Sequence, residues 1–466
     1  MLFSSSVFLF LFLPVVLAVY YVPLRNWRAG QNIFLLLASL LFYGWGEPKY
    51  VYVMLFSILF NYLQGIWVGY FRKNGRKTTA PVACSVVVNV LILFIFKYLD
   101  FAVHNLNMLG FNVKSPGILR PIGISFFTFQ AMSYVFDVAW GRVQAQKNPL
   151  NVGLYIALFP QLIAGPIVKY ETIAEEIRSR RETWEGFGEG VKRFIIGLGK
   201  KVLIANQMAV IADAAYGAVA PAAGLAWLGS ICYTLQIYYD FSGYSDMAIG
   251  LGHMFGFHFP ENFKWPYTAK SMTEFWRRWH ISLSTWFREY VYFPLGGSRV
   301  EKRSKLIRNL FVVWMLTGIW HGASWTFILW GMFYFIFLTV EKTIHLGEKW
   351  PTFIRHFYTL FMINSAWVLF RADDIWAAMR YFAAMLGMNG IRGELEGFYF
   401  RENVVFLAAA ILFVFPASER FRNSLKSTVV EGTANLFYAA GILLIFAVSV
   451  SYIIKGTYNP FIYFNF

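Results

Sequence analysis

The residue best placed to do chemistry in this sequence is His321. It lies within residues 309–340, a run that contains no Asp, Glu, Lys or Arg. A membrane core of about 30 Å needs about 20 helical residues, so this run is too long for one crossing. It also contains a break beside the histidine, between Gly318 and Trp325. Because an ionisable side chain is costly at such depth, we interpret His321 as a reactive or ligand-contacting residue. The alternative is a buried histidine bonded to a backbone carbonyl.

A second histidine, His280, lies in a segment predicted to be one amphipathic helix over residues 271–292. The residues of its apolar face recur at helical spacing. They are Trp276, His280, Leu283, Phe287 and Tyr290. Ser271 or Thr273 is expected to cap the start of this helix. His280 is a candidate to orient a partner or polarise a carbonyl, and a histidine that only packs against tryptophan is the alternative.

Together these side chains favour acyl transfer from a thioester to a hydroxyl. That reaction needs a base near pH 7 and donors for the developing oxyanion, and His321 has the buried position of the base. Arg277 and Arg278 neighbour His280, and together with Arg288 they are expected to attract the phosphates of coenzyme A. The segment 239–246 combines two carboxylates with several hydroxyls, and we expect a polar network at a cavity wall there.

A metal site is not expected. His253 and His258 are five residues apart, a spacing that does not place both on one face of a helix. No third ligand follows at a standard spacing. The two cysteines, Cys84 and Cys232, both lie in apolar stretches and indicate no disulfide framework.

The elements that must position these residues are membrane helices. Of the 466 residues, 58% are hydrophobic and 14% are charged, with a mean hydropathy of +0.50. This composition predicts an all-α, polytopic membrane protein with one integral-membrane domain over residues 1–466. The net charge of +16 comes from short loops between apolar runs, where basic residues set topology and contact anionic lipid. We therefore expect no nucleic-acid partner.

Two segments have an expected placement in the membrane. The run 152–168 contains Pro160 and Gly165-Pro166 and has basic flanks on both sides. A segment with two cytoplasmic flanks does not cross once, so we predict a re-entrant hairpin whose tip faces protein or water. By the same charge argument, residues 455–466 lie on the extracytoplasmic side.

Several strings resemble the membrane-bound O-acyltransferase family, in particular its bacterial alginate and peptidoglycan O-acetyltransferase branch. They are Tyr239-Asp-Phe-Ser-Gly-Tyr-Ser-Asp246, Ser271-Met-Thr-Glu-Phe-Trp-Arg-Arg-Trp-His280 with the following Ile-Ser-Leu-Ser-Thr-Trp286, Phe159-Pro-Gln-Leu-Ile-Ala-Gly-Pro166 and Gly318-Ile-Trp-His-Gly322. The resemblance spans nearly the whole chain. It implies a helical bundle with a central funnel, with His321 as the catalytic histidine at its floor and His280 as the second family histidine.

The resemblance also implies partners and a donor. The donor would be acetyl-CoA from the cytoplasm, the site would lie in the inner membrane of a bacterium, and the final acceptor would be a polysaccharide hydroxyl reached with an extracytoplasmic partner of the SGNH type. The terminal Phe461-Ile-Tyr463-Phe-Asn-Phe466 resembles a C-terminal motif of acyl-export systems in which the tyrosine is a proposed acyl carrier. An interfacial aromatic anchor is the alternative for Tyr463.

A transporter or channel remains the competing class, because a broken helix with an intramembrane histidine also suits proton or solute translocation. Transporters of that kind usually contain two homologous halves, and no internal duplication is visible in this sequence.

Overall fold

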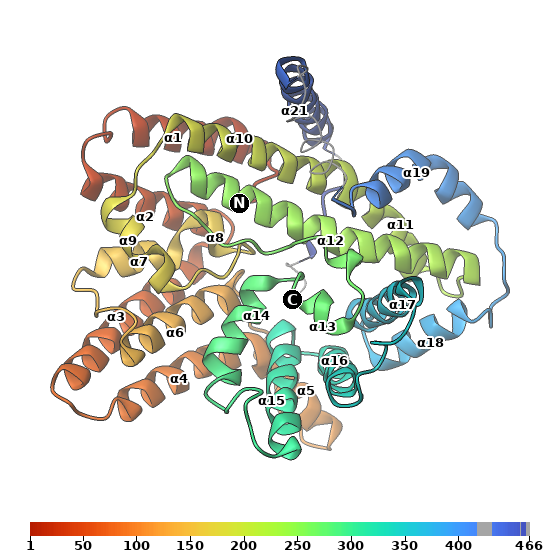
Figure 1. The fold of residues 1–466 in the computed structure, drawn as a ribbon, viewed down its shortest axis with the longest axis horizontal. Coiled ribbons are helices and arrows are strands. Elements are labelled where there is room, and N and C mark those ends of the chain that lie inside the picture. The colour runs from red at the N-terminus through yellow and green to blue at the C-terminus, as the bar shows by residue number, and fades with distance from the viewer. Residues whose placement is uncertain (417–430, 457, 463–466) are drawn as a thin grey trace. The chain divides into compact units, whose positions relative to one another are not determined.

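The structure is a computed structural model and describes residues 1–416, 431–456 and 458–462 (Figure 1). Within these ranges the regular structure is helical and no strand occurs, which confirms the predicted all-α class. The chain divides into two compact units, with residues 1–194 and 247–260 in unit 1 and residues 195–246 and 261–466 in unit 2. Two of the three divisions fall within helices α10 and α12, and the third, after residue 260, falls between helices. That residues 1–466 act as one domain stays a prediction.

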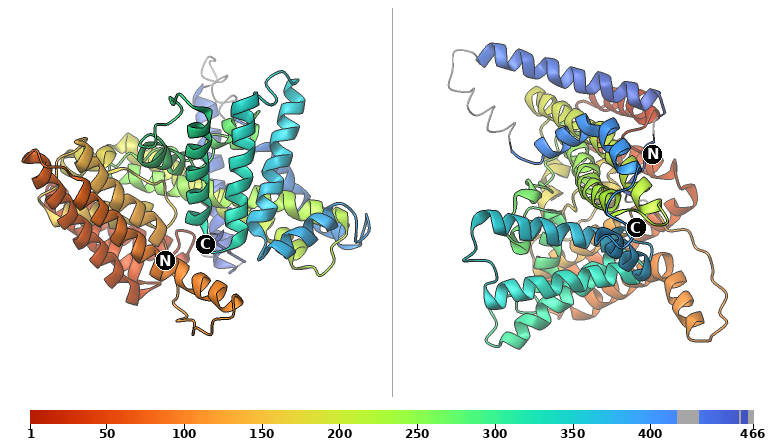
Figure 2. Two further views of the ribbon diagram at one scale, coloured as in Figure 1. Left: turned by 90° about the horizontal axis from the view of Figure 1, so that it is seen from below. Right: turned by 90° about the vertical axis from the view of Figure 1, so that its right-hand side faces the viewer.

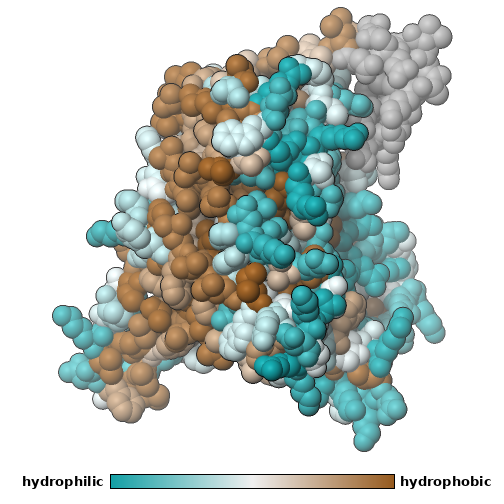
Figure 3. Space-filling model, turned by 90° about the vertical axis from the view of Figure 1, so that its left-hand side faces the viewer, coloured by the Kyte–Doolittle hydropathy of each residue, from teal (hydrophilic) through white to brown (hydrophobic). Residues whose placement is uncertain are grey.

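Unit 1 consists mainly of the N-terminal helices. They are α1 (Leu13–Tyr21), α2 (Arg28–Gly44), α3 (Val51–Lys73), α4 (Thr79–Leu93), α5 (Leu99–Met108), α6 (Ile124–Trp140), α7 (Pro149–Ala157), α8 (Phe159–Leu162), α9 (Tyr170–Ser179) and the first part of α10 (Trp184–Gly199). Helix α3 packs against α6 and α7, and α2 packs against α7. Large apolar side chains of α2, α3 and α4 are exposed, such as Leu41, Leu59 and Val87, and the surface drawn in Figure 3 has a broad hydrophobic area. Such a surface suits lipid contact.

The segment 152–168 folds back on itself, as predicted for a hairpin. Helix α7 ends at Ala157, the short α8 follows, and every residue from 152 to 168 is buried. The Tyr155 hydroxyl donates to the Val168 carbonyl at 2.9 Å, so the two ends of the segment lie side by side. The Gln161 side chain donates to the Tyr155 carbonyl at 2.6 Å. The turn is therefore held by hydrogen bonds to other protein atoms. That it re-enters a membrane stays a prediction.

Unit 2 holds the end of α10, α12 (Ala223–Met254) as far as Asp246, and the helices that follow. The others are the π-helix η4 (Lys200–Ala205), α11 (Asn206–Gly217), the 3-10 helix η5 (Pro266–Thr268), α13 (Met272–Trp276), α14 (Ile281–Phe287), the π-helix η6 (Arg288–Tyr292), α15 (Arg303–His321), α16 (Trp325–Ile344), α17 (Thr352–Arg371), α18 (Ile375–Met385), α19 (Leu395–Leu412) and α21 (Glu431–Ile454). Helices α15, α16 and α17 stand side by side, visible in the left panel of Figure 2.

Helices α15 and α16 approach closely because glycine faces glycine. A Cβ atom on Gly318 would lie 2.6 Å from the Phe327 carbonyl oxygen, and one on Gly331 would lie 2.5 Å from the Trp314 carbonyl oxygen. Small residues at such positions let helix backbones meet in membrane bundles. The close contact fixes the end of α15, where His321 is located.

Five helical stretches of the described chain are long and apolar enough to cross a membrane, judged by length and composition. They span Pro48–Lys73, Thr79–Met108, Trp184–Gly217, Trp325–Ile344 and Leu436–Ile454.

Candidate active site

The segment around His280 is not the single helix that the sequence predicts. Helix α13 ends at Trp276, and α14 starts only at Ile281. Between them His280 has a left-handed backbone, with φ 44° and ψ 52°, a conformation that is uncommon for residues other than glycine. The prediction of one continuous amphipathic helix over residues 271–292 is therefore wrong. Its predicted N-cap is confirmed, because the Ser271 hydroxyl accepts from the Glu274 backbone N–H at 3.0 Å.

The break is stabilised by a segment distant in sequence. The Ile281 backbone N–H donates to the Asn262 carbonyl at 3.0 Å, and the Lys264 N–H donates to the Arg278 carbonyl at 2.9 Å. These bonds satisfy backbone groups that lose their helical partners at the break. Residues 262–264 thus hold the chain in the conformation that orients His280.

Asn262 also holds the imidazole itself. Its Oδ1 lies 3.2 Å from His280 Nδ1 and accepts from the Ser282 backbone N–H at 3.2 Å. Because a backbone N–H only donates, the atom it meets must be the amide oxygen, and His280 Nδ1 must carry the proton. The other amide end donates to Ser245 at 3.1 Å. The neutral His280 therefore presents its lone pair at Nε2. Asn262 was missed by the sequence reasoning, since nothing in its local pattern indicates a contact 18 residues away.

His280 has no solvent exposure and lies among aromatic rings. Its ring is 4.6 Å from that of Phe241 and 6.0 Å from that of Trp320, between centroids. The residue is outside all five candidate spans. Burial lowers the pKa of His280 to about 3, because the low-dielectric surroundings disfavour the charged imidazolium. His280 is therefore neutral at physiological pH.

His321 is the last residue of α15, at the interruption that the sequence predicts. Only 5% of the residue is exposed. Its ring meets the rings of Trp330 at 4.8 Å and Phe370 at 5.3 Å, both edge to face. A Cβ atom on the next residue, Gly322, would lie 2.2 Å from the Phe327 ring, so a larger residue there would displace that ring. Ser324 caps α16 by accepting from the Thr326 N–H at 3.3 Å. The predicted break and the buried position of His321 are both confirmed.

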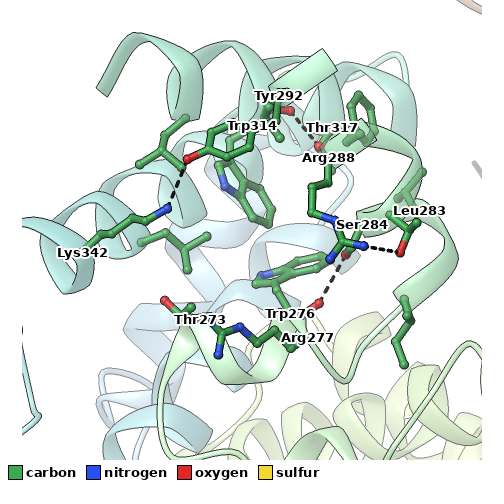
Figure 4. A pocket seen from close by; sticks show the side chains of 16 residues that line it. Thr273, Trp276, Arg277, Leu283, Ser284, Arg288, Tyr292, Trp314, Thr317 and Lys342 are labelled. Atoms are coloured by element: carbon green, nitrogen blue, oxygen red, sulfur yellow. Dashed lines mark hydrogen bonds between the residues drawn. The ribbon is translucent and has the colours of Figure 1, made fainter. Parts of the chain in front are cut away.

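A pocket of about 330 Å³ lies in unit 2, lined by α13, α14, η6, α15 and α16. Its inner wall includes Trp276 and Trp314, and Figure 4 shows three cationic side chains around them. These are Arg277, Arg288 and Lys342. Two of the three predicted arginines therefore line one pocket.

Arg278 does not line this pocket. Its guanidinium bonds Glu274 at 2.5 Å and the Thr268 hydroxyl at 2.8 Å. Lys342, which lies 54 residues beyond Arg288 in the sequence, takes its place and donates to the Tyr292 hydroxyl at 3.2 Å. Arg277 and Arg278 both lie between the end of α13 at Trp276 and the start of α14 at Ile281, and only Arg277 lines the pocket.

The pocket and the two histidines are joined by the same helices. Helix α14 lines the pocket from Ile281 onward, directly after His280, and α15 lines it as far as Thr317, four residues before His321. The Trp276 ring of the pocket wall lies 5.7 Å from that of Trp330, which in turn contacts His321. Two rings, those of Trp276 and Trp330, thus connect the pocket wall to His321.

The segment 239–246 forms a polar network, as predicted, while its place at a cavity wall stays a prediction. Asp246 pairs with Lys200 at 2.6 Å, and Asp240 pairs with Lys201 at 2.7 Å. Ser245 connects the segment to Asn262. Tyr463 lies outside the described residues, but residues 458–462 that precede it belong to unit 2.

No cluster of three metal-ligating side chains occurs within the described ranges. The His253 and His258 rings lie 5.2 Å apart. His258 is beyond the end of α12 at Met254, so the chain turns back. The Nδ1 atom of His258 lies 2.7 Å from Glu176 Oε1.

Comparisons with known proteins identify the family. Residues 142–379, which include both histidines, match the family model described as MBOAT, membrane-bound O-acyltransferase family. The chain is 39% identical to the probable alginate O-acetylase AlgI of Pseudomonas putida and 37% identical to that of Azotobacter vinelandii, over 100% of each chain. It is 33% identical to the peptidoglycan O-acetyltransferase of Helicobacter pylori, over 100% of this chain and 98% of that protein. The resemblance seen in the sequence is confirmed: this chain belongs to the membrane-bound O-acyltransferase family and is a multi-pass membrane acyltransferase.

Proposed function

We propose that this protein transfers acetyl groups from cytoplasmic acetyl-CoA to an extracytoplasmic acceptor, for the O-acetylation of a polysaccharide. The protein would act in the inner membrane of a bacterium. The observation that carries the proposal is the cationic pocket, whose lining includes α14, which begins directly after His280, and α15, which ends at His321. The relatives support the acyl group and the class of acceptor, since their names specify O-acetylation of alginate and of peptidoglycan.

In this proposal the pocket binds the donor. Arg277, Arg288 and Lys342 bind the phosphates of coenzyme A, because guanidinium and ammonium groups form charge-assisted hydrogen bonds with phosphate. The apolar wall of Trp276 and Trp314 suits the uncharged arm that carries the thioester. The arm then follows α14 and α15 toward the histidines.

The chemistry needs a base at the acceptor hydroxyl. His321 removes the hydroxyl proton as the oxygen attacks the thioester carbonyl, the C–S bond breaks, and the proton passes to the leaving thiolate. His280 has a different part. Because Asn262 fixes the proton of His280 on Nδ1, Nε2 accepts a hydrogen bond and cannot donate one to a carbonyl. His280 therefore orients the acceptor hydroxyl rather than polarising the thioester.

We propose Tyr463 as the first acceptor. Its phenol is a poor nucleophile until a base takes its proton, which His321 supplies. The resulting phenyl ester is more reactive than an alkyl ester. It passes the acetyl group, with an extracytoplasmic partner of the SGNH type, to a sugar hydroxyl and regenerates the phenol.

The donor half is tested with purified protein. Incubation with acetyl-CoA should release free coenzyme A at a rate that depends on protein, and His321→Ala should abolish this release. Proton or solute flux in vesicles, without any thioester cleavage, would instead support a translocation function.

The carrier half is tested with Tyr463→Phe, which keeps the ring and removes one oxygen. Cells with this variant at matched protein level should lose polysaccharide acetylation. Wild-type acetylation would refute the carrier role and leave Tyr463 as an aromatic anchor. Mass spectrometry of the exopolysaccharide and of the cell wall from a deletion strain would identify the final acceptor.

A further inference from the structure

The last described residues of the chain are bound within unit 2. The Tyr458 hydroxyl donates to Asp213 at 2.8 Å, and the Asn459 side chain accepts from Asn206 at 3.3 Å. The next residues are buried, with Phe461 5% exposed and Ile462 6% exposed. Residues 458–462, the C-terminal segment, are therefore docked at several points.

The C-terminal segment also contacts a buried ion pair. Lys201 and Asp240 are 3% and 1% exposed, and Lys201 Nζ lies 2.7 Å from Asp240 Oδ1. Each member also takes one backbone group of the C-terminal segment. Lys201 Nζ donates to the Pro460 carbonyl, and the Ile462 N–H donates to Asp240 Oδ2 at 2.9 Å. An isolated buried ion pair is expensive unless further hydrogen bonds satisfy it, and the segment supplies those bonds.

This arrangement recognises backbone direction. The cation takes a carbonyl, and the carboxylate takes the N–H group two residues later, so a segment running in the opposite direction would present these groups in the wrong order. Between them the Phe461 ring packs against Tyr244 at 5.1 Å and lies under Lys201 Nζ at 5.8 Å. The aromatic contact covers the pair, and a lower local dielectric strengthens both hydrogen bonds.

We infer that Lys201 and Asp240 form a clamp that holds the C-terminal segment in one direction, while the Phe461 ring, packed against Tyr244 and Lys201, sets its register. Asp240 immediately precedes Phe241, whose ring contacts His280 at 4.6 Å. The clamp thereby fixes Ile462, the residue before Tyr463, to the same turn of α12 that supports His280. Its consequence for acyl transfer rests on the proposed function, in which Tyr463 is the acceptor. Lys201 and Asp240 are positioning residues in this role.

The test measures docking directly by cysteine labelling of the full-length protein in detergent. Cys84 and Cys232 are replaced, and Ile462→Cys supplies one reporter thiol. With the clamp intact a maleimide should label this buried position slowly. The double variant Lys201→Met with Asp240→Leu removes both charges together, so that neither is left buried alone. It should raise the labelling rate by more than about tenfold, because local opening of the segment is then favoured.

A charge-swapped variant separates a clamp from a merely structural pair. Lys201→Asp with Asp240→Lys keeps an ion pair but turns an acceptor toward the Pro460 carbonyl and a donor toward the Ile462 N–H. The clamp predicts fast labelling in this variant as well. Wild-type protection in the swapped variant, or in the apolar double variant, would overturn the inference.

Two further variants guard against general unfolding. Arg28→Met breaks the ion pair of Arg28 with Glu182 (2.5 Å) in unit 1 and should leave the reporter thiol protected. Phe461→Ala alters only the segment and should accelerate labelling without a change in the bundle.

Labelling requires no acyl donor, so its result is independent of the carrier proposal. If Tyr463→Phe acetylates normally while the clamp variants expose the reporter thiol, the clamp stands and the carrier role fails. If Tyr463→Phe is inactive while the clamp variants keep that thiol protected, the clamp fails and the carrier role stands.

Discussion

Each unit contains a buried interruption of helix, and the two are built differently. In unit 1 the turn after α7 is bonded by its own polar side chains and neighbours: Gln161 donates to the Tyr155 carbonyl, and the Phe159 N–H donates to Ser39 at 3.0 Å. The side chain at that turn is a neutral amide. In unit 2 the interruption after α15 begins with the imidazole of His321.

The surroundings of the two interruptions differ as well. Gln161 reaches backbone atoms, while the ring of His321 packs beside those of Trp320, Trp330 and Phe370. Aromatic rings restrict the motion of an imidazole and exclude water from it. The comparison teaches that a break in a buried helix can occur with or without an ionisable side chain. Whether the break can take part in acid–base chemistry depends on the side chain located there.

The largest expected effect is the difference in the rate of acetyl transfer between His321→Ala and Gln161→Ala. Loss of a general base costs about 10²–10⁴-fold in rate, so His321→Ala should remove acetyl transfer while the protein remains folded. Gln161→Ala removes a buried hydrogen bond and should cost about 1–3 kcal/mol in stability with no comparable loss of rate. Turnover per folded protein, with thermal unfolding measured on the same samples, checks both. Activity above about a tenth of wild type in His321→Ala would place the base elsewhere.

The next effect concerns Asn262, which aligns His280. A misplacement of about 1 Å can cost up to 10²-fold in rate, so Asn262→Ala should lower acetyl transfer by about ten- to a hundredfold. Asn262→Asp retains an acceptor for His280 Nδ1 and for Ser282 and should restore much of the rate. If alanine and aspartate variants are equally impaired at equal stability, Asn262 has no positioning role.

The sequence predicts the break at His321 better than the break at His280, and the reason is physical. Gly318 and Gly322 lie beside His321, so the cause of the first break is local. The second break depends on hydrogen bonds from residues 262–264, and a local apolar pattern extends across it undisturbed. Lys342 was missed for the same reason, because α16 reaches the pocket only through tertiary packing.

A smaller effect follows from the pKa of His280. The folded-state pKa is about 3, below the ordinary value of about 6.5, so between these values the unfolded state binds a proton that the folded state does not. Stability therefore falls as the pH falls from 7 to 5, by about 2 kcal/mol from this residue. The His280→Gln variant cannot take up that proton, so its stability should fall less between pH 7 and pH 5. Thermal unfolding midpoints of both proteins at pH 7 and pH 5 measure the difference; an equal decrease in both would contradict the neutral, buried state of His280.

The smallest effect tests which cations belong to the pocket. Arg277, Arg288 and Lys342 line it, whereas Arg278 lies in the same short segment but bonds Glu274 and Thr268. An exposed charge contact is worth up to about 1 kcal/mol, which is about a fivefold change in binding.

We therefore expect the KM for acetyl-CoA to rise by up to about fivefold, with little change in kcat, in each of the variants Arg277→Gln, Arg288→Gln and Lys342→Gln. Because the contacts are between charged groups, a higher salt concentration should reduce the difference in KM between each variant and wild type. Arg278→Gln is the matched control, since it removes the same charge from a side chain that does not line the pocket, and its KM should stay close to wild type. A KM increase for Arg278→Gln equal to that for Arg277→Gln would show that the donor responds to the overall positive charge of this segment, and that the pocket geometry does not select which side chains bind it.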